Sequence, residues 1–132
     1  MERALAINGV IVLFTGLVGG YAFSKAIQKK PEREVAWRVV HSGGSMAGIM
    51  LLALAASWKI LDFKGYSPLF AMGIIISTHL FMVAMFAAAI TGKRGLSSDS
   101  KGIEKGIYIV YGIASLISTV TMGGMLFYLW LD

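Results

Sequence analysis

The sequence predicts an all-α integral membrane protein, an antiparallel up-down four-helix bundle that forms oligomers. The 132 residues are 57% hydrophobic and only 14% charged, with a mean hydropathy of +0.74. They fall into four long apolar runs, separated by three short segments that contain Gly, Pro or charged residues. A helix that spans a bilayer needs about 20 apolar residues. Four spans therefore use nearly the whole length, which indicates a single transmembrane domain over residues 1–132.

The four expected spans cover about residues 4–24, 35–60, 68–90 and 103–131. The first run is longer than the apolar region of a signal peptide and lacks a small-residue cleavage site, so we expect a retained helix. Lys29, Lys30 and Pro31 end the first hairpin, residues 62–68 form the second turn, and residues 92–102 form the third. All three connections are short, so neighbouring helices are expected to be antiparallel.

Basic residues are distributed unevenly along the chain. Nine of the twelve Lys and Arg residues lie in or beside the first and third connections. Short basic loops stay in the cytoplasm, so we expect a multi-pass protein of the inner (cytoplasmic) membrane, with these two connections inside and both termini outside. The net charge of +5 then reflects topology, and no nucleic-acid partner is expected. Aromatic residues near the span ends are expected to anchor the chain at the bilayer surface: Trp37, Trp58, Tyr66, Tyr128 and Trp130.

Two features of the composition exclude several kinds of chemistry. The chain has no cysteine, which excludes disulfides, thiolate catalysis and cysteine-ligated metal sites. All acidic residues lie at or beyond the ends of the expected spans: Glu2, Glu32, Glu34, Asp62, Asp99, Glu104 and Asp132. A small multidrug transporter needs a carboxylate inside the membrane, and a Ser-His-Asp hydrolase needs one near its histidine. Both classes are therefore excluded.

The second span carries an unusual polar group. His41, Gly44, Ser45 and Gly48 stand at positions i, i+3, i+4 and i+7, so they share one helical face. An ionisable group inside a span is costly unless it is paired or liganded, and neutral imidazole is a common ligand of metals and haem iron. The two glycines leave room for a flat macrocycle or another helix, and Arg38 can pair with an anion such as a haem propionate. These five residues are the predicted cofactor site, with His41 as the metal ligand.

Other interpretations of these residues remain open. His41 could be a hydrogen-bonded packing histidine, and Arg38 could be a snorkelling residue at the cytoplasmic surface. Small residues four apart bring helices together in lipid, and the first two spans contain such pairs: Gly16 with Gly20, and Gly44 with Gly48. A haem-free small subunit that packs within a larger membrane complex through these glycines is thus an alternative.

The second histidine, His79, lies in the middle of the third span. Its expected depth differs from that of His41 by about eight residues, or roughly 12 Å at 1.5 Å per residue. Two axial ligands of one iron do not tolerate this separation. We therefore do not expect both histidines of one chain to ligate the same haem, and we expect His79 to be a packing or pocket-lining residue.

The chain resembles the styrene oxide isomerase family, small four-helix membrane proteins that convert aryl epoxides to aldehydes. The similar residues are Trp37, Arg38, His41-Ser42-Gly43 and Gly48-Ile49-Met50, with weaker similarity at residues 8–11, 94–96 and 121–123. The resemblance implies a homotrimer with haem b between neighbouring protomers and its iron held by His41. It further implies that ferric haem acts as a Lewis acid on a small apolar epoxide. In that family the benzylic C–O bond opens, a hydride migrates and the aldehyde leaves without net redox change, so the resemblance implies an isomerisation of the intramolecular oxidoreductase type.

The sequence departs from the family at two polar positions near the substrate. The family has an Asn about two turns after the histidine and a Tyr on the third helix. Here these positions hold Ala47 and, depending on the alignment, Met85 or Phe86. Four residues are candidates to replace the missing polar groups: Ser45, Thr78, His79 and Tyr111. Without isomerase activity, a haem protein of this kind would serve in sensing, gas binding or electron transfer.

Overall fold

The structure, a computed structural model, describes residues 1–131. It contains four long helices: α1 (Glu2–Lys29), α2 (Glu34–Leu61), α3 (Ser67–Thr91) and α4 (Ile103–Leu131). Two short 3-10 turns precede α2 and α3, namely η1 (Pro31–Arg33) and η2 (Lys64–Tyr66). All four helices are long and apolar enough to cross a membrane. The prediction of an all-α chain with four helices able to span a membrane is confirmed. Of the acidic residues expected at span ends, Asp132 lies outside the described residues.

The ends of the helices follow from local chemistry. α1 continues to Lys29, beyond the expected end near residue 24, and a lysine in the last turn interacts favourably with the helix C-terminus. Pro31 then prevents continuation. α3 ends at Thr91 and is capped by Gly92, whose φ of 73° is left-handed and whose N–H donates to the Ala88 carbonyl over 2.9 Å. Pro31 and Gly92, both in predicted turns, therefore end α1 and α3. The charged residues after residue 24 continue α1 as far as Lys29.

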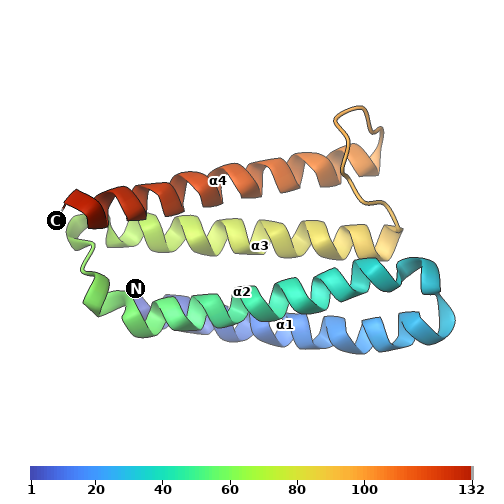
Figure 1. Cartoon of the computed structure of the whole chain (residues 1–132), viewed down its shortest axis with the longest axis horizontal. Coiled ribbons are helices and arrows are strands. Elements are labelled where there is room, and N and C mark those ends of the chain that lie inside the picture. Colours follow the sequence, from blue (N-terminus) through green and yellow to red (C-terminus); the bar gives the residue numbers. More distant parts are fainter. Residues whose placement is uncertain (132) are drawn as a thin grey trace.

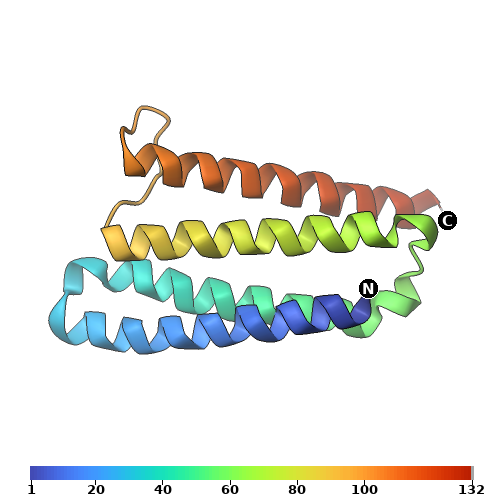
Figure 2. The same ribbon diagram turned by 180° about the vertical axis from the view of Figure 1, so that it is seen from behind.

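The helices associate as two pairs. α1 packs mainly on α2, α4 packs mainly on α3, and the pairs meet chiefly through α2 and α3. Figure 1 shows the α1–α2 and α3–α4 connections at one end of the molecule, and the N-terminus with the α2–α3 connection at the other. Seen from behind in Figure 2, α1 lies alongside α2. α3 is the most buried helix and α4 the least, and large apolar side chains such as Phe14, Met46 and Leu116 are exposed on the outer surface, as lipid contact requires.

An aromatic cluster joins the two pairs near the α2–α3 connection. The ring of buried Phe63 lies 5.0 Å from that of Trp58, 5.1 Å from that of Phe70 and 5.8 Å from that of Tyr128 between centroids. Trp58 is only 4% exposed, so it is a core residue and not the surface anchor that its position predicted. Trp130, at 80% exposed, is placed as an anchor should be.

Candidate functional site

The glycines of α1 and α2 bring these two helices into backbone contact. A Cβ atom added at Gly16 would lie 2.5 Å from the Ser45 nitrogen, and one at Gly48 would lie 2.5 Å from the Leu13 nitrogen. At Gly44 the added atom would lie 2.8 Å from the Gly16 Cα. The small-residue face of α2 is therefore covered by α1 of the same chain. A flat macrocycle has no access to Gly44 and Gly48 here, although the sequence predicted them as part of the cofactor site.

His41 lies at the edge of this helix contact. Its Nδ1 atom is 3.0 Å from the carbonyl oxygen of Gly16. Because a carbonyl can only accept, Nδ1 carries the proton and donates it, which leaves the Nε2 lone pair free. Gly20 permits this approach, since a Cβ there would lie 2.7 Å from Nδ1. The half-buried ring is thus fixed by packing and still offers one nitrogen to a ligand.

His41 points away from α3. Two residues further on, Gly43 faces α3, where an added Cβ would lie 3.0 Å from the Met85 sulfur. Two residues span about 200° around an α-helix, so His41 lies on nearly the opposite side of α2. Arg38, one turn earlier, is exposed and makes no ion pair among the described residues, and Ser42 donates to its carbonyl over 2.9 Å.

Ser45 follows His41 by one turn. Its hydroxyl oxygen is buried and has no hydrogen-bond partner within residues 1–131, which is costly in an apolar setting. The described residues also contain no group of three or more His, Cys, Asp or Glu side chains that could hold a metal ion. Any iron at this site would therefore have His41 as a single ligand from this chain, as haem proteins with one proximal histidine do.

The other predicted polar residues border separate spaces. His79 donates from Nδ1 to the Ile75 carbonyl over 2.9 Å and lines a groove between α1 and α3, together with Thr15 and Met82. His41 is not part of that groove. His79 is therefore a pocket-lining residue, and the two histidines face different sides of α1.

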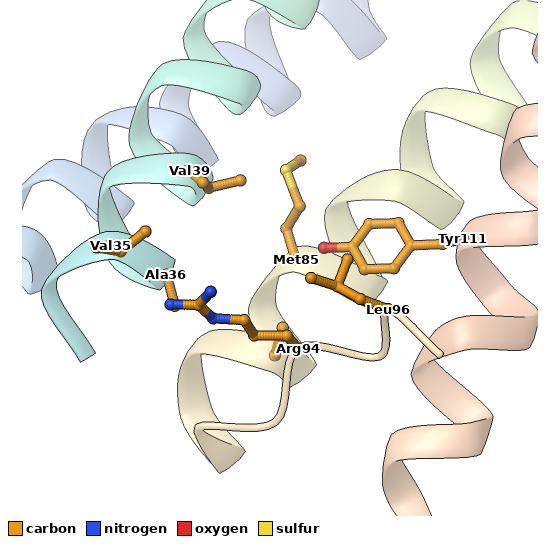
Figure 3. Close-up of a pocket in the computed structure, with 8 residues that line it drawn as sticks. Val35, Ala36, Val39, Met85, Arg94, Leu96 and Tyr111 are labelled. Atoms are coloured by element: carbon orange, nitrogen blue, oxygen red, sulfur yellow. The ribbon is translucent and has the colours of Figure 1, made fainter. Parts of the chain in front are cut away.

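Tyr111 lines a cavity of about 230 Å³ near the α3–α4 connection. In Figure 3 its hydroxyl points toward Met85, while the guanidinium of Arg94 extends toward Ala36 of α2. The described structure consequently does not bring together three of the four candidate polar residues: Ser45 lies between α1 and α2, His79 beside α1, and Tyr111 in this cavity.

A further cavity of about 280 Å³ lies between α2, α3 and α4. Its walls are mostly apolar, with three hydroxyl residues among them: Gly43, Ala47, Met50, Ile74, Ser77, Thr78, Phe81, Met85, Ser118 and Met122. Ala47 and Met85 thus line the same cavity. Phe86 is not among its walls and instead contacts Trp37 edge to face, with ring centroids 5.8 Å apart. This placement favours Met85 as the counterpart of Ala47.

Reasoning from sequence missed most of this cavity. Thr78 was a candidate, and the adjacent hydroxyls at Ser77 and Thr78 in mid-span were a usable signal. No pattern in the sequence associates Ser118 with them, because the contact between α3 and α4 brings it there.

Comparison with known proteins gives one result. The model of a family described as styrene oxide isomerase matches residues 1–131. Neither the curated proteins nor the solved structures include a match to the chain.

Proposed function

We propose, because the chain belongs to the styrene oxide isomerase family, that it binds haem b through His41 and isomerises a small apolar epoxide to an aldehyde. One structural observation carries the cofactor half of this proposal. The Nδ1–H of His41 is held by the Gly16 carbonyl at 3.0 Å, which leaves Nε2 as the free nitrogen. Metal-bound histidines characteristically donate the other ring nitrogen in this way, which fixes the ring and raises its basicity.

Two residues would hold the cofactor. His41 would ligate the iron through Nε2, and exposed Arg38 would pair with a carboxylate at the macrocycle edge. The Ser45 hydroxyl, which the sequence also predicted as part of the cofactor site, is buried between α1 and α2 and lies out of reach of a macrocycle. When bound, ferric haem supplies a Lewis acid for the epoxide oxygen. The chain must exclude water, because water would convert an opened epoxide to a diol. Apolar helix surfaces and Met-rich cavity walls serve this purpose.

A haem protein without isomerase activity is a second candidate, and the residues at the family's substrate positions support it. Ala47 and Met85 occupy the positions where the family carries polar groups, and neither side chain donates a strong hydrogen bond. This favours a haem protein without isomerase activity, used in sensing, gas binding or electron transfer. The haem-free small-subunit alternative has less support, because Gly16, Gly44 and Gly48 are already covered by contacts within the chain.

Assembly and orientation complete the proposal. We place the chain as an antiparallel up-down bundle in the inner membrane, with the basic α1–α2 and α3–α4 connections in the cytoplasm. His41 faces outward from the α1–α2 pair, and a chain with so little interior cannot enclose a macrocycle alone. A homotrimer with haem between neighbouring copies fits both features.

The cofactor proposal is tested by the visible spectrum of the protein purified in mild detergent. Wild type is expected to show a Soret band, and His41→Ala is expected to abolish or shift it. His79→Ala is the matched control, since His79 borders a different groove, and should leave the band unchanged. Absence of a Soret band in wild type after haem supplementation rejects haem binding. Loss of the band only in His79→Ala would make His79, and not His41, the iron ligand.

The reaction is tested separately on haem-loaded protein. Incubation with styrene oxide should yield phenylacetaldehyde, measured by gas chromatography, and His41→Ala should lose this activity. If haem-loaded wild type converts none of several aryl and alkyl epoxides, the non-isomerase candidate replaces the isomerase.

A further inference from the structure

Two hydroxyl groups that line the cavity between α2, α3 and α4 make no hydrogen bond within residues 1–131, those of Thr78 on α3 and Ser118 on α4, and Thr78 is the more deeply buried. Thr15, Ser42, Ser57 and Thr91 each donate to the carbonyl four residues earlier, the usual arrangement in an apolar helix. Thr78 does not: its side chain is only 5% exposed, and within residues 1–131 it makes no hydrogen bond. Its neighbour Ser77 is already engaged, since it donates to the Ile74 carbonyl over 3.1 Å. Thr78 thus presents a free donor to the cavity.

The cavity has the size and lining of a site for a small aromatic molecule. Its volume is about 280 Å³, and an apolar cavity of about 150 Å³ already binds benzene. Gly43 and Ala47 of α2 create the space, because they carry almost no side chain on the wall that faces α3. Phe81 and Met85 supply an aromatic and a polarisable surface on the opposite wall.

We propose that this cavity binds a monosubstituted benzene that carries one acceptor oxygen, and that the Thr78 hydroxyl donates a hydrogen bond to that oxygen. The choice of an epoxide or carbonyl oxygen rests on the proposed function, whereas the donor and the cavity do not. The same hydrogen bond stabilises the negative charge that grows on an epoxide oxygen as its C–O bond opens. Thr78 thereby provides a polar contact that Ala47 and Met85 cannot.

Two ligands of nearly equal shape isolate the hydrogen bond. Acetophenone has a carbonyl oxygen where α-methylstyrene has a CH₂ group. Binding is measured by equilibrium dialysis as the amount retained by protein-containing micelles above that retained by empty micelles. Wild type is expected to bind acetophenone about fivefold more tightly than α-methylstyrene, the effect of one neutral hydrogen bond.

Thr78→Val removes the hydroxyl and keeps the shape of the side chain. It should bring the acetophenone preference to about one without weakening α-methylstyrene, because only the hydrogen bond is lost. The control Thr119→Val alters an exposed threonine of α4 and should keep the preference. Ala47→Phe fills the cavity and should abolish excess binding of both ligands. A preference that survives Thr78→Val, or binding that survives Ala47→Phe, overturns the proposal.

The outcome is distinguishable from failure of the proposed function. His41 lies on the far side of α2 from this cavity, so haem-free protein and His41→Ala should bind both ligands as wild type does. A preference seen without any Soret band supports the cavity while haem binding is rejected. If the protein binds haem and isomerises epoxides but does not prefer acetophenone to α-methylstyrene, only the assignment of Thr78 is rejected.

Discussion

The absence of a side chain at Gly20 lets one ring nitrogen of His41 bond to α1 while the other stays available to a ligand. Gly20 lies against the His41 ring, where a Cβ would be 2.7 Å from Nδ1 and 3.0 Å from Cε1. With that space empty, Nδ1 reaches the Gly16 carbonyl and the ring orientation is fixed. The packing role and the ligand role that the sequence left as alternatives are therefore compatible: one nitrogen serves each.

Gly20→Ala should separate these roles. The added methyl group collides with the ring, so the bond to Gly16 breaks or the ring turns, and a metal ligand that loses its hydrogen-bonded support typically loses about 10- to 100-fold in affinity. Haemin titration followed at the Soret band measures this change. Gly106→Ala on α4, where nothing lies within 4 Å, should bind haemin as wild type does. Equal affinity of the two variants would contradict a supporting role for Gly20.

The residues of the site were predictable only in part. An ionisable residue on a glycine-rich face made His41 the candidate ligand, and this stays a prediction; the sequence does not state which surface covers that face. In the structure α1 covers this face, so Gly44 and Gly48 are contact residues within the chain. The cavity around Thr78 depends on three helices meeting, and no spacing along one helix contains that information.

Among the elements, α1 and α2 are held together by the close fit of their glycine-lined surfaces. In lipid, helix association depends on close packing because the surrounding tails are as apolar as the side chains. Four apolar runs were sufficient to predict four helices, since a backbone in lipid must satisfy its hydrogen bonds internally. The helix ends were less predictable: α1 extends through Lys25 and Lys29, because long lysine side chains reach the headgroups while the backbone stays helical.

Gly48→Val tests this contact at the level of the helix pair. A side chain at Gly48 meets the Leu13 backbone at 2.5–2.7 Å, and backbone atoms cannot move aside cheaply. We expect a loss of about 1–3 kcal/mol in unfolding free energy, as for other overpacked sites. Circular dichroism during titration with sodium dodecyl sulfate measures it.

Gly112→Val is the control for this prediction, because a Cβ at Gly112 meets nothing within 4 Å. Its unfolding free energy should stay within about 0.5 kcal/mol of wild type. If both valine variants lose the same amount, the cost comes from β-branching in a helix and not from contact between α1 and α2.

At the scale of the whole molecule, α2 separates the two halves of the proposed site. His41 faces outward beside α1, whereas Ala47 and Thr78 line the cavity between α2, α3 and α4. One chain cannot present both to the same small molecule. A closed ring of identical subunits solves this problem, because its heterologous interfaces place one face of a chain against a different face of the next. We therefore expect each reaction site to use His41 of one copy and the cavity of its neighbour.

Mixed oligomers test this expectation. His41→Ala removes the ligand and Ala47→Phe fills the cavity, so each variant alone should be inactive toward styrene oxide. In a ring assembled at random from equal amounts of both, about a quarter of the interfaces pair an intact histidine with an intact cavity. Co-expression should thus recover about a quarter of wild-type activity. A site within one chain would recover none.

The reverse mixture provides the control. Wild type co-assembled with the double variant His41→Ala, Ala47→Phe has both intact parts in one chain. Sites between copies again leave about a quarter of the activity, because both neighbours must be wild type. Sites within a chain would leave about half. The two mixtures give equal activity only when the site is shared between copies, and a difference between them assigns His41 and the cavity to a single chain.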